Sequence, residues 1–356
     1  MNSSVSKNKA VGKISTAKIT IIGAALLLIS AVLAIGAGST AIQPDKVVLA
    51  LLEGAGLAPS GSVPAETLAA VCAIRLPRVL CGVLAGAGLA AAGVVMQGVF
   101  RNPLADPGLL GVSSGASLGA LIAIMAGAGA FIALPASAFL GALLAVFMIL
   151  GISLAASGRG AAPPVTLVLG GMAVSAMFNA VTLLVLTASN EYQTSSYMFW
   201  TMGGLANRRF EHVFIMAAPV LMCIAGITAW APRLDVLMLG DEEAHSLGIH
   251  PVRTRVAMIV AASLCTAAIV CVSGPIGFVG LMVPHIMRMA VGPSHRRLVV
   301  ASVFGGGVFL TVCDAFIRLL SQINGREYSV GILTALIGAP YFIYLLMRKG
   351  GRGGVF

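Results

Sequence analysis

The chain has 356 residues, of which 58% are hydrophobic and 10% are charged, and its net charge is +10. Apolar runs of about 18 to 25 residues recur along nearly its whole length, each long enough to cross a bilayer as a helix, which excludes a soluble domain. The basic residues lie mainly at the ends of these runs, as membrane topology requires, and this argues against a nucleic-acid partner. The composition therefore predicts an all-α polytopic membrane protein of about ten transmembrane helices.

The N-terminal segment, residues 1–18, carries four lysines and no acid, so we expect it to stay in the cytoplasm while the run from Ile19 to about Gly36 crosses outward. A signal peptide is the alternative, since the sequence ending at Ala41 is similar to a cleavage site. The length of the run favours an uncleaved span. We expect a single transmembrane domain over residues 19–348 and a cytoplasmic tail over residues 349–356.

Residues 39 to 74 are more polar and are interpreted as an external loop with one short amphipathic helix near Val47 to Leu52. The second span, about Leu76 to Phe100, carries a GxxxG contact face at Gly82 and Gly86. A polar turn follows. The third span, about Gly108 to Ala126, has one face nearly bare of side chains, because glycine recurs at Gly111, Gly115 and Gly119.

The fourth and fifth spans are predicted at about Leu134 to Ala155 and Val165 to Leu186, joined on the inside. Ser189 to Arg209 is interpreted as an external connection, with Trp200 near a membrane interface. The sixth span covers about Val213 to Ala231, and the seventh about Val256 to Val272.

Glycines and prolines between residues 274 and 284 interrupt the next apolar segment, which predicts a bent or short eighth span ending at Arg288. The ninth span, about Leu298 to Leu320, carries Asp314 and Arg318, interpreted as a local i,i+4 salt bridge. The tenth runs from about Val330 to Met347. This layout places 15 of the 22 Lys and Arg residues inside and 7 outside, with both termini cytoplasmic.

A dense polar island, Leu237 to Arg255, separates the sixth and seventh spans and must lie in water. Asp241 can cap a helix of about two turns, and Gly248 suits the left-handed residue that ends it. Because so short a helix is marginal alone, and because it has apolar residues, we expect it to dock against something. A solvated loop with an incidental helical turn is the alternative interpretation.

No phosphate-binding G-x-x-x-x-G-K-[ST] loop is present, so the chain is not expected to hydrolyse ATP by that route. No catalytic nucleophile with a base is evident, and His245, His250 and His285 form no metal signature. We therefore expect neither catalytic nor metal-binding residues and no cofactor bound by this chain. The cysteines lie singly with no CxxC pair, and packing is their expected role: Cys72, Cys81, Cys223, Cys265, Cys271 and Cys313.

Five ordered motifs over about residues 70 to 348 resemble FecCD-type permeases, the subunits of type II ABC importers for iron-siderophores, haem and cobalamin. They are RLPR from Arg75, the run from Gln97 to Ala116, LGDEEAHSLGI from Leu239, GPIGFVGLMVPHIMR from Gly274 and GILTALIGAPYFIYLL from Gly331. The resemblance implies a type II permease fold in the inner membrane of a bacterium. It also implies a homodimer with the pathway between two copies, two cytoplasmic ATPase subunits that use ATP and Mg, and an external substrate-binding protein.

The resemblance assigns roles to particular residues. The cytoplasmic coupling helices would lie within residues 239–250 and contact the ATPase through Gly240, Asp241, Glu242, Ala244, Leu247, Gly248 and Ile249. Contacts with the binding protein would fall on Arg75, Arg78 and Arg318, for which interfacial anchoring and the pairing of Arg318 with Asp314 are the alternatives. Cytoplasmic gate positions would be Asn102, Leu104, Pro164 and Val165, which are otherwise simple turn residues.

Two departures from the family pattern stand out. Ser329 replaces a proline that many relatives carry before the last span, and Pro163 with Pro164 replaces small hydroxyl residues at the inner gate. The predicted function is import of an intact iron chelate, haem or ferric siderophore, along a pathway lined by small Gly, Ala and Ser faces. Cobalamin import is the alternative, followed by an ion-coupled secondary transporter that would depend on Asp314, and an intramembrane enzyme lacks a catalytic set.

Overall fold

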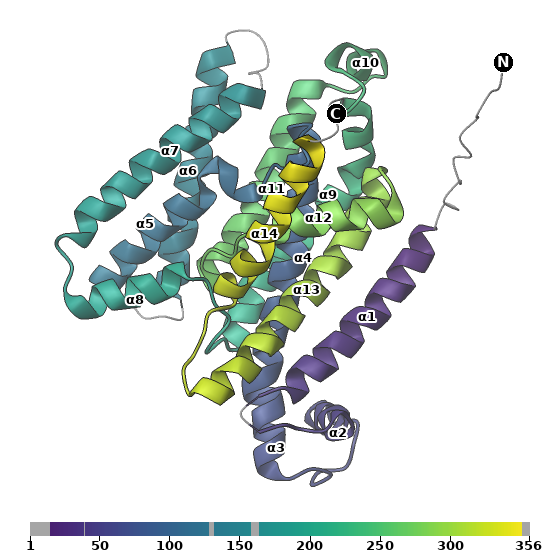
Figure 1. Cartoon of the computed structure of the whole chain (residues 1–356), viewed down its shortest axis with the longest axis vertical. Coiled ribbons are helices and arrows are strands. Elements are labelled where there is room, and N and C mark those ends of the chain that lie inside the picture. The colour runs from purple at the N-terminus through teal and green to yellow at the C-terminus, as the bar shows by residue number, and fades with distance from the viewer. Residues whose placement is uncertain (1–14, 39, 128–131, 158–163, 351–356) are drawn as a thin grey trace.

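Helices form every regular element in the part of the chain that the computed structural model describes, residues 15–38, 40–127, 132–157 and 164–350. Eight helical segments are long and apolar enough to cross a membrane, and two shorter apolar helices complete the ten predicted spans. They run side by side in one bundle (Figure 1). In chain order the spans are α1 (Thr16–Gly36), α4 (Leu76–Val99), α5 (Val112–Met125), α6 (Ala133–Ser157), α7 (Pro164–Leu186), α9 (Phe210–Leu237), α11 (Pro251–Ser273), α12 (Val279–Val291), α13 (His295–Asn324) and α14 (Val330–Gly350).

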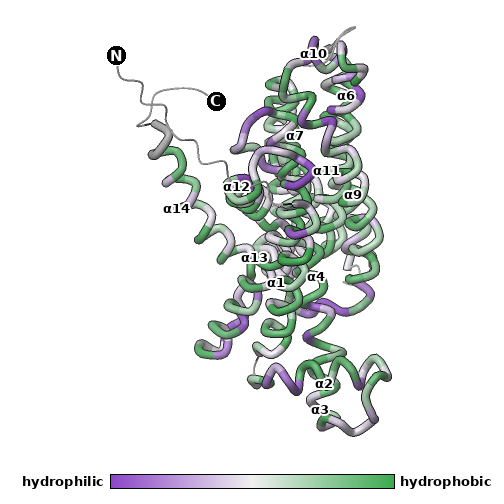
Figure 2. Tube along the Cα trace, turned by 90° about the vertical axis from the view of Figure 1, so that its right-hand side faces the viewer, coloured by the Kyte–Doolittle hydropathy of each residue, from purple (hydrophilic) through white to green (hydrophobic). Residues whose placement is uncertain are grey.

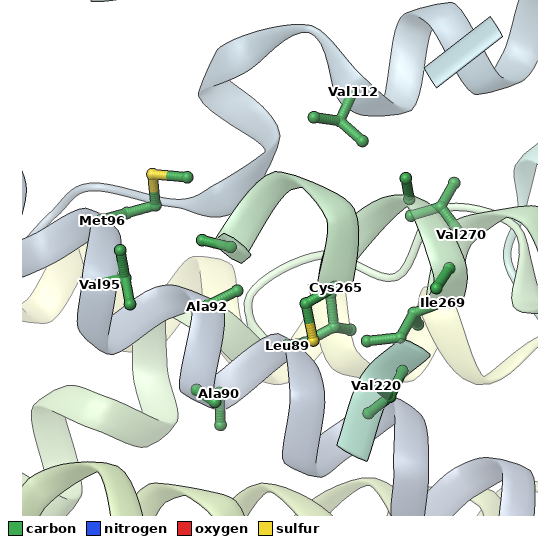
Figure 3. Close-up of a cluster of buried hydrophobic side chains, with 14 of the residues drawn as sticks. Leu89, Ala90, Ala92, Val95, Met96, Val112, Val220, Cys265, Ile269 and Val270 are labelled. Atoms are coloured by element: carbon green, nitrogen blue, oxygen red, sulfur yellow. The ribbon is translucent and has the colours of Figure 1, made fainter. Parts of the chain in front are cut away.

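The central helix of the bundle is α4, which packs against α9, α11, α12 and α13. The most apolar window of the segment that contains it is 83% buried, against 17% for α14 and 22% for α7. Figure 3 shows why it packs so closely: Leu89 and Ala92 of α4 meet Val220 of α9 and Cys265 of α11 through small or branched side chains. The centre of the bundle is therefore covered by protein, whereas α7 and α14 have large faces that this chain leaves uncovered.

Glycine permits the closest helix contacts of the core. A Cβ built on Gly86 would lie 2.1 Å from the carbonyl oxygen of Gly306 in α13, and one built on Gly93 would lie 1.8 Å from that of Gly280 in α12. Only glycine allows backbones to approach so closely. The predicted contact face on the second span is therefore confirmed at Gly86, whereas Gly82 meets the side chain of Leu205 instead.

The bare face of α5 packs inside the same chain. A Cβ on Gly115 would lie 2.3 Å from the carbonyl oxygen of Gly141, and one on Gly119 would lie 2.2 Å from that of Ser137, both in α6. These small residues hold two helices together. This stretch of the small-residue face is consequently a packing surface between neighbouring spans, which does not fit its expected place in the wall of a pathway.

Two connections contain helices that the sequence interpretation missed. The external loop over residues 39 to 74 contains α2 (Pro44–Gly54), close to the predicted helix. It also contains α3 (Ala65–Ala69) and a π-helical turn, η1 (Ala70–Arg75), which continue directly into α4. The connection from Ser189 to Arg209 contains α8 (Glu191–Thr201). Its first turn is fixed by a capping box in which the side chain of Asn190 accepts from the Gln193 N–H and the Gln193 side chain accepts in return.

The short eighth span is confirmed. Five non-helical residues separate α11 from α12, and the first and last of them, Gly274 and Phe278, both have φ of +67°. A Cβ built on Gly274 would lie 2.3 Å from the carbonyl oxygen of Trp200, so α8 packs directly on this break in the bundle. The irregular backbone is thus covered by protein, which is the condition under which a membrane-embedded chain can leave the helical conformation.

The two ends of the bundle differ. The small helix α10 (Asp241–Ser246) projects at one end, and α2 with α3 cover the opposite end (Figure 1). The first span begins and the last span ends on the side of α10, as an even number of spans requires. These ends are called the α10 end and the α2 end below.

Candidate functional site

The helix α10 is a single short element between α9 and α11 that projects at one end of the bundle and packs on both of these helices. Its backbone is closed by hydrogen bonds from the Ala244 N–H to the Gly240 carbonyl and from the Leu247 N–H to the Glu243 carbonyl, both 3.1 Å. Gly248 follows with φ of +78°, which confirms the predicted left-handed end of the helix. Ala244 is fully buried, whereas Leu247 is 62% exposed.

The exposed side of α10 carries both acid and apolar groups. Glu242 is exposed on the helix, and Leu239, two residues before the helix begins, is 63% exposed. On the buried side, Ile249 packs against the core. One face of this small helix is therefore anchored in the bundle, and the other presents leucine and carboxylate side chains outward.

Asp241 has a different role from the capping residue that the sequence predicted. Gly240 occupies the cap position without any side-chain hydrogen bond, and Asp241 is the first residue of the helix. Its carboxylate instead pairs with two arginines. Arg255 of α11 donates to it through both terminal nitrogens, one at 2.7 Å, and Arg101 donates at 3.0 Å. The capping assignment is wrong because the guanidinium groups, distant in sequence, compete for the carboxylate.

This ion-pair cluster fixes the orientation of α10. The Arg255 side chain is only 9% exposed, whereas that of Asp241 is 48% exposed. Hydrogen bonding by Arg255, together with the positive charges of Arg255 and Arg101, holds the pKa of Asp241 below its ordinary value despite partial desolvation. The carboxylate is therefore ionised throughout the neutral range and holds the start of α10 against the end of α11.

Arg101 also links α10 to the turn after α4. Its guanidinium donates to the carbonyl of Leu237 at 2.6 Å as well as to Asp241. The next residue, Asn102, shapes the turn itself, since its side-chain oxygen accepts from the Leu104 N–H at 2.9 Å. Asn102 is exposed and Leu104 is half-buried. The predicted gate residues of this turn are thus joined by one arginine to the docking helix.

The second pair of predicted gate residues lies at the start of α7. Pro164 is the first residue of that helix, and the side chain of Val165 is 65% exposed. α7 begins at the α10 end (Figure 1) but meets the segment after the Asn102 turn deeper in the bundle, where a Cβ on Gly171 would lie 2.2 Å from the carbonyl oxygen of Leu109. Pro163 lies outside the described residues. The two pairs therefore share one end of the molecule without forming a single cluster.

At the α2 end, three predicted arginines line one recess of about 410 Å³. Arg75 is buried and donates to the carbonyl oxygens of Ile35, Gly36 and Thr40 at 2.7–3.0 Å. It thereby holds the end of α1 against α4. This contact is stronger than the interfacial anchoring considered from the sequence, because the guanidinium satisfies backbone groups that the end of a helix leaves open.

Arg78 and Arg318 share one buried acid. The Asp314 side chain, 3% exposed, lies 2.8 Å from a terminal nitrogen of Arg78 and 3.1 Å from Nε of Arg318. The predicted i,i+4 pair is confirmed, and the contact from α4 to the same carboxylate is an addition that the sequence did not reveal. Arg318 also donates to the carbonyls of Ala34 and Ala37. Two further residues of the recess were missed, the exposed Arg326 and Glu327.

Among the described residues no group of three or more His, Cys, Asp or Glu side chains is placed to hold a metal ion. His245 and His250 do lie together, with ring centroids 5.6 Å apart, because the turn at Gly248 folds one over the other. All six cysteines are free.

Comparison with known proteins gives one consistent result. The FecCD transport family matches residues 26–348. The chain is 44% identical over 291 residues, 82% of its length, to the cobalamin import system permease protein BtuC of Halobacterium salinarum, of which 76% is covered. It is 39% identical over 282 residues, 78% of its length, to the hemin transport system permease protein HmuU of Yersinia pestis, of which 82% is covered.

A solved structure has the same architecture. It is described as an inward-facing conformation of a metal-chelate type ABC transporter, and it superposes with a TM-score of 0.80 at 31% sequence identity. The match covers 93% of this chain and 99% of that chain. The arrangement of ten spans is therefore shared along nearly the whole length of both proteins.

Proposed function

This chain belongs to the FecCD transport family and is a permease of an ABC importer, and we propose that it passes an intact metal chelate into the cytoplasm by alternating access. Motion would come from two separate ATPase subunits. The observation that carries this proposal is the form of α10, which is anchored by Ala244 and Asp241 and presents Glu242 and Leu247 outward. An exposed helix face that carries both acidic and apolar side chains is suited to bind in a cleft of a soluble partner.

The orientation follows from the same helix. An ATPase is a cytoplasmic protein, so the α10 end would face the cytoplasm, and both chain termini would lie there with the basic N-terminal segment. The α2 end would face outward. The chain would therefore be a multi-pass protein of the cytoplasmic membrane, with α2, α3 and the arginine-lined recess exposed to an external binding protein.

The recess supports contact with an external binding protein, but through a different set of arginines from the one that the sequence predicted. Arg75 and Arg318 already satisfy the ends of α1, so they shape the recess more than they offer free charge. Arg326 is exposed at its rim. We propose that acidic groups of a binding protein meet Arg326 at the rim, with Arg78, already paired with Asp314 and 3.9 Å from Glu327, behind it, since charge-assisted contacts at a rim suit a partner that must leave again.

A homodimer would complete the pathway. The most apolar windows of α7 and α14 are only 22% and 17% buried, so these helices have large faces that the chain itself does not cover. Figure 2 shows α14 leaning away from the rest of the bundle. We propose that a second copy covers part of these faces and that the pathway runs between the two chains.

The substrate proposal is a metal–tetrapyrrole chelate, haem or cobalamin. The relatives at 44% and 39% identity are named for cobalamin and hemin, so the earlier preference for an iron chelate over cobalamin is not retained. A ferric siderophore is a third cargo for the same assay. Handover of so large a ligand requires a wide path with weak contacts, because a tight site along the way would hold the cargo back.

The test is reconstitution of the full chain with its ATPase and binding protein in vesicles. We expect ATP-dependent uptake of hemin or cobalamin that stops when the ATPase is omitted. Uptake that continues without the ATPase and is abolished by Asp314→Asn would instead show an ion-coupled carrier.

A second measurement tests the docking helix. Glu242→Ala with Leu247→Ala is expected to reduce co-purification of the ATPase while the thermal stability of the permease stays unchanged. The matched control removes the same kinds of side chain at the α2 end, Glu66→Ala with Leu57→Ala, both exposed. Equal loss of the ATPase in both pairs, or no loss in the first, would refute the assignment.

A further inference from the structure

An apolar groove of about 580 Å³ runs along the outside of the bundle between α1, α12, α13 and α14. Every lining residue is apolar, from Ile19 and Leu26 on α1 to Ala301 and Val312 on α13, with Ile337 of α14 along one side. α14 is the least buried span and leans away from its neighbours (Figure 2), which leaves the groove open toward the membrane. Its position therefore places it where hydrocarbon chains, and not water, are the solvent.

The groove covers one leaflet. Its wall on α13 extends from Ala301 to Cys313, or about 18 Å at a rise of about 1.5 Å per residue. Half of the hydrocarbon core of a bilayer measures about 15 Å. On α1 it begins at Ile19, in the first turn of that helix. The groove thus reaches from the membrane surface at the α10 end to about the middle of the bilayer.

Basic residues lie at the surface end of both walls. Lys18 is exposed and shares a face of α1 with Ile22, one turn further into the groove. Arg297 shares a face of α13 with Ala301 in the same way, and its guanidinium lies near Gly292, next to the groove residue Val291. Within the described part of the chain neither cation takes part in an ion pair.

Two acids at this end are already paired, and Glu242 and Glu243, unpaired in the described part of the chain, lie on α10, which packs on α9 and α11 and not on the groove helices. The Asp235 carboxylate lies 2.6 Å from the ring of His295, and that of Asp241 is held by its two arginines. The groove mouth is therefore a place of uncompensated positive charge above an apolar channel. That combination matches an anionic phospholipid, whose phosphate is negative and whose acyl chain is apolar over the length of one leaflet.

We propose that this groove is a binding site for an anionic phospholipid of the leaflet at the α10 end, with its headgroup phosphate facing Lys18 and Arg297 and an acyl chain lying against α1 and α13. A second copy of the chain is the less favourable occupant. With a two-fold axis beside the groove mouth, a second copy would bring another Lys18 and Arg297 to it, and the like charges would repel.

Lipid binding to the purified full chain, followed by native mass spectrometry after delipidation, tests the proposal. Dioleoyl phosphatidylglycerol is the anionic probe and dioleoyl phosphatidylcholine the matched zwitterionic one. The parent chain is expected to prefer phosphatidylglycerol, and Lys18→Gln with Arg297→Gln to weaken that lipid about thirtyfold, since each basic contact contributes about a factor of five. Binding of phosphatidylcholine should not change.

Arg253→Gln with Arg296→Gln is the control, because it removes two arginines from the same end that do not belong to the groove faces. It should leave the preference intact. Val308→Trp narrows the groove from a half-buried position and should weaken both lipids. A preference that survives the loss of Lys18 and Arg297, or that falls equally in the control, overturns the proposal.

A further measurement distinguishes the second occupant. Ile22→Cys is treated with a short bis-maleimide in native membranes beside the parent chain. If Ile22→Cys gives a cross-linked dimer that the parent chain does not give, a second chain covers the groove and the lipid site is refuted. Absence of that product, with the lipid preference above, supports it.

Discussion

Replacement of Asp241 by asparagine tests how the docking helix is held. The change keeps the size of the side chain but removes the charge that pairs with Arg255 and Arg101. A hydrogen bond to a charged group is worth about 1.5–3 kcal/mol, and water at the half-exposed carboxylate recovers part of it. We therefore expect a net loss of about 1–2 kcal/mol in the local stability of α10, because the buried Arg255 loses its counter-charge.

Hydrogen–deuterium exchange of the chain in lipid nanodiscs measures this loss directly. The amides of Ala244, Leu247 and Ile249 donate the bonds that close α10 and the turn after it. A loss of about 1–2 kcal/mol predicts exchange about 5 to 30 times faster at these amides, with the spans unchanged. Glu242→Gln is the control, since it removes an exposed acid from the same turn. Exchange within twofold of the parent in Asp241→Asn, or equal acceleration in the control, would contradict the clamp.

Three further outcomes are expected. The pKa of Asp241 is lowered, so its contribution to the stability of α10 is complete above the ordinary aspartate pKa of about 3.9 and is lost as the pH falls through the lower pKa of the folded state. Hydrogen exchange at α10, corrected for intrinsic rates, should therefore rise only below about pH 4. A rise between pH 5 and 8 would contradict this. Gly93→Ala places a methyl group 1.8 Å from a carbonyl of α12 and should cost at least about 3 kcal/mol in thermal unfolding, whereas Gly226→Ala, with nothing within 4 Å, should be tolerated. Asp314→Asn removes the buried counter-charge shared by Arg78 and Arg318, leaving only the exposed Glu327 at 3.9 Å from Arg78, and should destabilise by about 3–5 kcal/mol, against little effect for the exposed Asp45→Asn; equal melting temperatures would show that the Asp314 contacts are not structural.

The spans could be predicted because the bilayer imposes one length and one composition on every helix that crosses it. That constraint located α1, α7 and α14 within a few residues of their observed limits. It says nothing of helices that lie along a surface. α8 is short and of mixed polarity, and its only local signal is the capping box formed by Asn190 and Gln193. That pair was present in the sequence and could have predicted the helix.

The contacts of the candidate site could be predicted only where both partners are neighbours in sequence. Asp314 and Arg318 are four residues apart on one helix, and their pairing follows from helical periodicity. Arg78 reaches the same carboxylate from 236 residues away, and Arg101 reaches Asp241 across 140 residues. Such pairs depend on how whole spans pack, which one sequence without homologues does not encode in any local pattern.

The same long-range contacts explain how a push on α10 can reach the turn at Asn102. Arg101 bonds both Leu237 at the end of α9 and Asp241 at the start of α10, so the docking helix and the turn share one guanidinium. The α4 core beneath the turn is locked by glycine contacts with α12 and α13 and cannot slide without collision. α7 and α14 are less covered by this chain, although each also makes a close glycine contact, Gly171 with Leu109 and Gly338 with Phe278. We therefore expect a displacement of α10 to move the turn at Asn102 first, because Arg101 joins the two, while the closely packed α4 resists sliding.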